Sequence, residues 1–124
     1  MAWTFKTQGA IVGCPAIGPE GTVYVASEDA MLYALSPEGQ KRWEYKTQGL
    51  IKASPVVNQF GQILVADGNG YLHMVNGSGV KTWIFSIVGT AFSATPAISS
   101  DNSIYLGNLN ARFFGLTDQG KTKW

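Results

Sequence analysis

The chain has 124 residues, of which 45% are hydrophobic and 14% charged, and its formal net charge is +1. This composition indicates a folded domain with one core and excludes a disordered chain. The small net charge argues against nucleic acid or an anionic membrane as partner, the apolar runs are too short to span a bilayer, and one cysteine excludes an intrachain disulfide.

The sequence repeats itself with a period of about 40 residues. Residues 3–42 align with residues 43–82 without a gap at 13 identities, and the third unit, 83–123, carries one extra residue. The positions that recur in phase are Trp3, Trp43, Trp83 and Trp124, Pro15, Pro55 and Pro96, and Gly39, Gly79 and Gly120. We therefore predict a single domain over residues 1–124 that is built from three repeats.

Each unit shows the pattern of short strands separated by turns. In chain order, residues 2–6 resemble a fourth strand that precedes the first unit, and the first unit then has strand patterns at 14–18, 22–27, 31–36 and 40–46. β-Branched and aromatic residues fill these stretches, and Gly, Pro, Asp and Asn separate them. The second and third units repeat the pattern, so we expect twelve antiparallel strands joined by tight hairpins.

The two middle strands of each unit are apolar on both faces, as in residues 23–26 and 32–35. A sheet buried on both faces must be stacked between other sheets. Four-stranded sheets of about 40 residues that stack face to face are the blades of a β-propeller. We predict an all-β fold with three such blades, whose fourth strands form a solvated outer rim carrying Lys41, Arg42, Glu44, Lys46, Lys81, Lys121 and Lys123.

Residues 33–45, Tyr-Ala-Leu-Ser-Pro-Glu-Gly-Gln-Lys-Arg-Trp-Glu-Tyr, resemble the tryptophan-docking repeat of PQQ-like, quinoprotein-type propellers. The spacing of four residues from glycine to tryptophan holds in all three units. The resemblance implies a propeller family, often of the bacterial cell envelope, in which each tryptophan packs near the glycine of a neighbouring blade. It assigns Trp43 and Trp83 to that role, with Gly39 and Gly79 as their platforms.

The resemblance does not extend to a cofactor site. Quinone-dependent members of the family stack their cofactor on a disulfide of adjacent cysteines, beside calcium ligands and a catalytic aspartate. Cys14 is the one cysteine of this chain. We therefore expect no catalytic, cofactor-binding or metal-binding residues, and no enzymatic activity.

Two polar positions allow a functional and a structural interpretation. Asp67-Gly-Asn-Gly resembles the start of a calcium loop but lacks its later acidic ligands, and we favour a hairpin turn. His73, the one histidine, aligns with the bulky Tyr33 and Phe114. A packing residue between blades is favoured over a metal ligand or a catalytic base, because no partner of the right type is evident.

Two further features also allow both interpretations. Cys14 aligns with Ser54 and Thr95, which are small residues before proline. This pattern favours a space constraint beside the inner strand over a reactive thiol. The cationic residues of the outer strands are mixed with acidic ones, which favours a solvated rim over a nucleic-acid surface.

Three functional hypotheses follow. We favour a non-catalytic module that acts as a binding or protein-interaction scaffold, with a protein partner. The first alternative is a purely structural, self-assembling propeller segment without ligand, natural or engineered. The third and least favoured is a fragment of a quinone-dependent dehydrogenase.

Three blades do not close a ring, because each would have to turn by about 120°. A dimer gives six blades at about 60° each and a trimer nine at about 40°, against about 45° in the eight-bladed rings that the resemblance implies. We therefore expect a homo-oligomer and favour the trimer, because close packing resists large angular change.

The strand around Trp3 should then complete the third blade of a neighbour, next to residues 111–116, in competition with Trp124. Without a neighbour, the end blades should expose apolar faces, with residues such as Val23, Val25, Tyr105 and Leu116.

Overall fold

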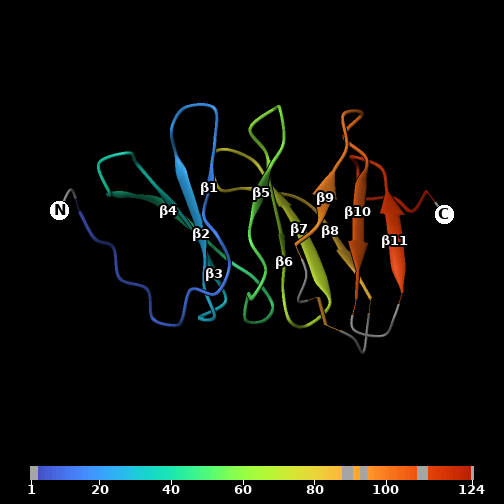
Figure 1. Cartoon of the computed structure of the whole chain (residues 1–124), viewed down its shortest axis with the longest axis horizontal. Coiled ribbons are helices and arrows are strands. Elements are labelled where there is room, and N and C mark those ends of the chain that lie inside the picture. Colours follow the sequence, from blue (N-terminus) through green and yellow to red (C-terminus); the bar gives the residue numbers. More distant parts are fainter. Residues whose placement is uncertain (1–2, 88–90, 93–94, 109–111, 124) are drawn as a thin grey trace.

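A computed structural model describes residues 3–87, 91–92, 95–108 and 112–123 as three antiparallel sheets. Blade 1 contains β1 (Ala16–Ile17), β2 (Val23–Ala26), β3 (Met31–Leu35) and β4 (Lys41–Lys46). Blade 2 contains β5 (Val56–Val57), β6 (Ile63–Ala66), β7 (Tyr71–Val75) and β8 (Lys81–Ser86). Blade 3 contains β9 (Ala97–Ile98), β10 (Ile104–Gly107) and β11 (Phe113–Leu116). The three blades lie side by side along the long axis of the molecule (Figure 1).

The described residues contain eleven strands where the sequence predicted twelve. At the place of the twelfth strand, Thr122 forms an isolated bridge with Leu116. Residues 3–6 are not a strand either, because no described segment pairs with them. The described residues contain no helix, and so no helix that could cross a membrane.

The hairpins of the three blades have the same register. Val25 lies opposite Tyr33, Val65 opposite His73, and Leu106 opposite Phe114. In blades 1 and 2 the pairing of the third and fourth strands shifts just after the residue opposite the tryptophan, at Ala34 and at Met74. The repeat in the sequence is therefore a repeat in the backbone.

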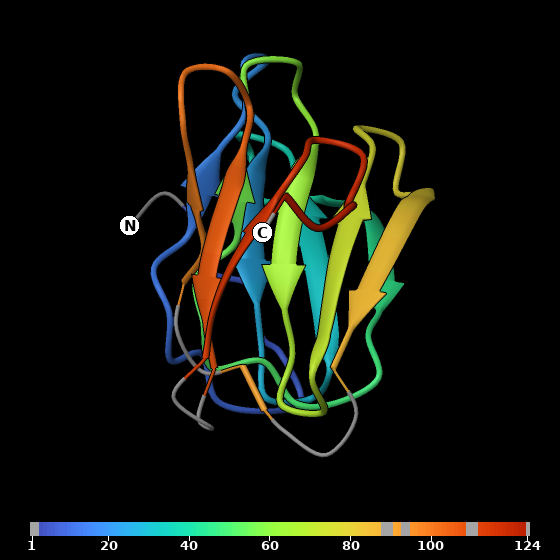
Figure 2. The same cartoon turned by 90° about the vertical axis from the view of Figure 1, so that its right-hand side faces the viewer.

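The hydrophobic core lies in the seams between blades. The seam between blades 1 and 2 buries Tyr24, Ala26, Leu32, Ala34, Ile51, Ile63, Val65 and Val75. The seam between blades 2 and 3 buries Leu64, Ala66, Leu72, Met74, Phe92, Ile104, Leu106 and Leu116. Each face of blade 2 is covered by a neighbouring blade, as we predicted from strands that are apolar on both faces. Figure 2, a view along the stack, shows the sheets one behind another.

The end faces of the stack differ from the prediction at one residue. Val23, Val25 and Tyr105 are half-buried, whereas Leu116 is fully buried. Strand alternation explains the correction, because Leu116 points towards blade 2 and belongs to its seam. Phe113 is on the outer face instead and is 61% exposed.

Candidate functional site

Three tryptophans make equivalent contacts at the outer rim: Trp43 and Trp83 fasten neighbouring blades together, and Trp3 fastens the segment before blade 1 to that blade. The indole Nε1 of Trp43 donates to the Gly77 carbonyl at 3.0 Å, and that of Trp83 to the Asp118 carbonyl at 3.0 Å. Trp3 makes the same bond to the Pro37 carbonyl at 2.9 Å. Each indole therefore reaches the hairpin between the third and fourth strands of the next blade along the chain.

The glycine in each of these hairpins lies beneath an indole ring. Gly39 faces Trp3, Gly79 faces Trp43 and Gly120 faces Trp83. Trp43 and Trp83 thus contact glycines of the following blade. These glycines are Gly79 and Gly120, and not the predicted Gly39 and Gly79. Trp124, the last of the recurring tryptophans, lies outside the described residues.

The recurring residues before the prolines, just ahead of the first strand of each blade, are hydrogen-bonded to one another. Ser54 Oγ accepts a hydrogen bond from the backbone N–H of Cys14 at 2.8 Å, and Thr95 Oγ1 accepts one from the N–H of Ser54 at 3.0 Å. A small side chain with an acceptor oxygen can make this contact, which explains the serine and the threonine. Cys14 itself is exposed.

His73 is fully buried at the seam between blades, and it also belongs to a buried chain of hydrogen bonds that the sequence did not predict. Its Nε2 lies 2.8 Å from Asp67 Oδ2, and its Nδ1 lies 2.9 Å from the Tyr45 hydroxyl. His73 and Asp67 are fully buried. Tyr45 comes from β4 of blade 1, so this chain of hydrogen bonds crosses the seam between the two blades.

Asp67 is the acceptor at the centre of this arrangement. Besides His73, it accepts backbone N–H groups of Gln48, Asn69 and Tyr71 at 2.9, 2.9 and 3.1 Å. Burial raises the pKa of the Asp67 carboxyl, but these hydrogen bonds outweigh burial and the pKa is lowered overall. The carboxylate oxygens are thus used by protein donors, and residues 67–70 form the hairpin turn that we favoured over a calcium loop.

Asp29 has the same role in blade 1, two residues further along the hairpin. It accepts the Tyr33 hydroxyl at 2.5 Å and the backbone N–H of Gln8 at 3.0 Å. Burial raises the pKa of Asp29, and its hydrogen bonds from Tyr33, Gln8, Met31 and Ser27 lower it by more. Each of the two carboxylates thus holds the chain segment that precedes its blade against that blade. Comparison of the repeats did not reveal this shared role, because Asp29 aligns with Asn69 and not with Asp67.

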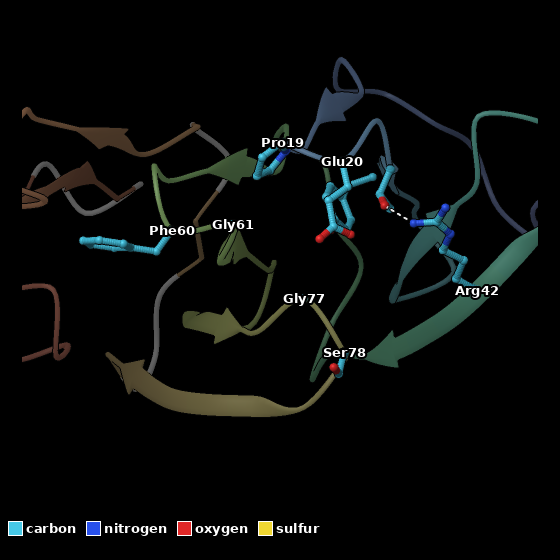
Figure 3. A pocket seen from close by; sticks show the side chains of 9 residues that line it. Pro19, Glu20, Arg42, Phe60, Gly61, Gly77 and Ser78 are labelled. Atoms are coloured by element: carbon cyan, nitrogen blue, oxygen red, sulfur yellow. Dashed lines mark hydrogen bonds between the residues drawn. The ribbon is translucent and has the colours of Figure 1, made fainter.

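A pocket of about 280 Å³ opens in the seam between blades 1 and 2, on the face that carries the β1–β2 and β3–β4 hairpins. We call this surface the hairpin face. The residues that line the pocket are Pro19, Glu20, Thr22, Tyr24, Arg42, Phe60, Gly61, Gly77 and Ser78. Figure 3 shows Glu20 between Arg42 and Phe60, with the Phe60 ring pointing away from both.

One of the two charged groups of this pocket is held by a hydrogen bond. Arg42 Nη1 donates to the hydroxyl of the buried Thr22. Burial and the charge of Glu20 raise the pKa of the Tyr24 phenol, whereas the Thr22 hydrogen bond and the charge of Arg42 lower it. The pKa is raised overall, so the phenol is neutral at pH 7. In the described part of the chain, neither Glu20 nor Arg42 forms an ion pair. The pocket therefore presents the Arg42 cation, which Thr22 holds in place, and the exposed carboxylate of Glu20.

The second seam lacks this polar set. The positions that correspond to Thr22, Tyr24 and Arg42 are Gln62, Leu64 and Thr82. Blades 2 and 3 nevertheless pack through a continuous core. Because that seam forms without this set, the fold does not require these side chains at this place in the repeat.

A larger hollow of about 490 Å³ lies between residues 5–8 and the outer strands of blade 1. Its acidic groups are already paired, since Lys41 forms an ion pair with Glu44 and Asp29 is hydrogen-bonded as described. Among the described residues, no cluster of three or more His, Cys, Asp or Glu side chains could hold a metal ion. The pocket with Arg42 is therefore our candidate site.

Comparison with known proteins identifies the family to which the chain belongs. Residues 1–124 match the family model described as outer membrane protein assembly factor BamB. The search of curated proteins produced no match.

The solved structures that share the fold include a BamB and two quinohaemoprotein alcohol dehydrogenases. BamB from Moraxella catarrhalis superposes with a TM-score of 0.82 at 20% identity, over 99% of this chain and 38% of that chain. The quinohaemoprotein alcohol dehydrogenase of Comamonas testosteroni gives 0.79 at 15% identity, over 94% and 21% of the two chains. That of Pseudomonas putida gives 0.83 at 15% identity, over 97% and 21%. The chain thus spans well under half the length of each, and at these identities the likeness establishes the propeller fold.

Proposed function

Because the chain belongs to the family described as outer membrane protein assembly factor BamB, we propose that it is a non-catalytic propeller module that binds a protein partner. The observation that carries this proposal is the pocket of Glu20 and Arg42, in which Thr22 holds Arg42 and the two charges form no ion pair with each other. A partner segment would place a carboxylate against Arg42 and a cation or N–H donor against Glu20. Charge-assisted hydrogen bonds of this kind are among the strongest polar contacts in proteins.

The surroundings of the pocket also support a protein partner. Phe60 is 67% exposed and Val80 is 59% exposed, and both belong to hairpins on the hairpin face. Interfaces concentrate their binding energy in aromatic residues and arginine. The fold supports such a role for the face, because the hairpins are held by the tryptophan contacts beneath them.

The test uses a probe suggested by the family description, an outer-membrane protein that is unfolded in urea and diluted into buffer. Binding is measured by fluorescence anisotropy for the unaltered chain, for Arg42→Gln and for the matched control Thr82→Ala in the other seam. We expect Arg42→Gln to raise Kd roughly tenfold or more, since a hydrogen bond to a charged group contributes about 1.5–3 kcal/mol. Thr82→Ala should leave Kd unchanged.

Two outcomes would contradict the proposal. Equal weakening by Arg42→Gln and Thr82→Ala would show that the pocket is not the contact. A folded chain without saturable binding would favour the alternative of a purely structural segment. Unfolding midpoints of both variants establish that the fold is intact.

The dehydrogenase alternative has its own test. The dehydrogenases share the fold with this chain, but fold alone does not carry function. Pyrroloquinoline quinone is titrated with calcium into the protein, and the visible absorbance is followed. We expect no saturable change, and a saturable absorbance band would favour the dehydrogenase fragment.

A further inference from the structure

Two asparagines of the chain are followed by glycine, in the steps Asn69–Gly70 and Asn76–Gly77. A glycine leaves its backbone nitrogen unshielded, because it has no side chain. In such a step the glycine nitrogen can attack the side-chain amide carbon of the asparagine and displace ammonia. The two steps have the same covalent chemistry, so a difference in their reactivity has to come from the fold.

The side chain of Asn76 is folded over the peptide that joins it to Gly77. Its Oδ1 accepts the backbone N–H groups of Ser78 at 2.9 Å and of Val80 at 3.1 Å. The ring that the first of these bonds closes contains the Gly77 nitrogen, so Cγ and this nitrogen lie in the same turn. The two donors also stabilise the negative charge that Oδ1 gains when a nucleophile adds to Cγ.

The backbone nitrogen of Gly77 is available as that nucleophile. Gly77 is exposed, and within the described part of the chain no group accepts a hydrogen bond from its N–H. The carbonyl oxygen of Asn76, which belongs to the same peptide group, accepts the Gly79 N–H at 3.0 Å. This bond draws electron density towards the oxygen and thereby favours loss of the Gly77 amide proton to solvent.

Asn69 is directed away from its own glycine. Its Nδ2 donates to the Gln48 carbonyl at 2.5 Å, and a Cβ added to Gly49 would come within 2.8 Å of the Asn69 Cγ atom. Gly70 is buried and has a φ of +87°. The Asn69 side chain is thus tied to the segment that precedes blade 2, and the nitrogen that would attack it is shielded from water.

The β7–β8 hairpin does not need an asparagine at position 76. In the equivalent hairpins, the hydroxyls of Ser36 and Thr117 accept the same two backbone N–H groups at distances of 3.1–3.3 Å. The residues that follow them are Pro37 and Asp118. The turn requires an acceptor oxygen, and blade 2 alone combines a side-chain amide with a following glycine at this place.

We propose that Asn76–Gly77 is a site of spontaneous deamidation, which proceeds through a succinimide to aspartate or isoaspartate. The Gly77 nitrogen loses its proton to solvent and bonds to Asn76 Cγ, and the Cγ–Nδ2 bond then breaks as the leaving nitrogen takes up a proton and departs as ammonia. Water that adds at Cγ breaks the new bond to the Gly77 nitrogen and gives aspartate. Water that adds at the main-chain carbon of residue 76 gives isoaspartate, whose main chain runs through Cβ and Cγ.

The modification lies at a contact between blades 1 and 2. The Gly77 carbonyl accepts the Trp43 indole N–H at 3.0 Å, and Gly77 and Ser78 line the pocket that contains Arg42. Isoaspartate inserts one carbon into the main chain just before Gly77 and therefore displaces this carbonyl, whereas aspartate keeps the backbone and adds a negative charge. The reaction is independent of whether the pocket binds a partner.

Peptide mapping by mass spectrometry tests the proposal. The chain is kept at physiological temperature and mildly alkaline pH for several weeks, folded in one series and unfolded in guanidinium chloride in another. One tryptic peptide, residues 53–81, contains both steps, and its fragment ions locate the exchange of amide for acid. In the folded chain we expect product at Asn76 to form at least about tenfold faster than at Asn69, because a single donor on an oxyanion has an effect of this size or more. In the unfolded chain the two rates should converge.

Gly77→Ala is the matched variant, because the turn has room for a Cβ there. It should suppress the reaction at Asn76 and leave the rate at Asn69 unchanged. Equal rates at the two steps of the folded chain, a faster reaction at Asn69, or no product at Asn76 while the unfolded chain reacts would overturn the proposal. The isoaspartate form, separated by ion exchange, should unfold at a lower temperature than the variant Asn76→Asp, and equal midpoints would overturn the predicted effect on the Trp43 contact.

Discussion

Gly79 has a φ of +86° and lies beneath the indole of Trp43, where an added Cβ would come within 2.7 Å of the Trp43 Cδ2 atom. Two requirements thus meet at one residue, a left-handed backbone conformation and room for a flat ring. Gly77, two residues earlier, accepts the indole hydrogen bond through its carbonyl, but an added Cβ there would have ample space.

Gly79→Ala should therefore lower the free energy of unfolding by about 2 kcal/mol or more, through backbone strain and displacement of the ring. Gly77→Ala, the matched control, should be neutral or slightly stabilising, because it restricts the unfolded chain. Urea unfolding followed by tryptophan fluorescence measures both. Equal effects of the two substitutions would show that the indole does not rest on Gly79.

The Asp67 carboxylate makes stability depend on pH. Its pKa is lowered in the folded state, so its contribution is complete above the unfolded value of about 3.9 and is lost as pH falls through the folded pKa. Asp67→Asn should be less stable than the unaltered chain at pH 7. Its unfolding free energy should also fall less steeply between pH 5 and pH 2. The measurement is the urea midpoint across this range, and parallel curves for both proteins would refute the assignment.

At the scale of elements, the fourth strands anchor one blade to the next. Trp43 and Trp83 are half-buried between blades, while Trp3 is 37% exposed on the outside of blade 1. We expect Trp43→Ala and Trp83→Ala to cost about 3 kcal/mol each, and Trp3→Ala distinctly less. Thermal unfolding compares the three. Equal melting shifts would mean that the segment around Trp3 is held as firmly as β4 and β8.

Strand positions and turns were predictable because they depend on local residue patterns. Asp-Gly and Asn-Gly sequences marked hairpins, and two-faced apolar strands marked stacked sheets. The chain from Asp67 through His73 to Tyr45 was not predictable, because it joins three elements of two blades. The face of Leu116 was misjudged for a related reason, since the parity of a strand depends on its register with its neighbour.

For the whole molecule, the blades form a stack whose seams contain both the core and the candidate site. The family resemblance and the propeller fold followed from the repeat. The Arg42 pocket did not, because it arises where two hairpins of blade 1 meet two hairpins of blade 2. Its residues Thr22, Tyr24 and Arg42 differ from those of the next seam, and this departure from the repeat was the available signal in the sequence.

The proposed binding surface of the chain is the hairpin face. Amide chemical-shift mapping by nuclear magnetic resonance tests this directly, with the unfolded outer-membrane protein as ligand. We predict that the shifts on binding gather at residues 18–22, 40–42, 60–62 and 76–80, around Glu20 and Arg42. Shifts that gather instead at the opposite hairpins, 27–30 and 67–70, would show that the partner does not bind at the hairpin face.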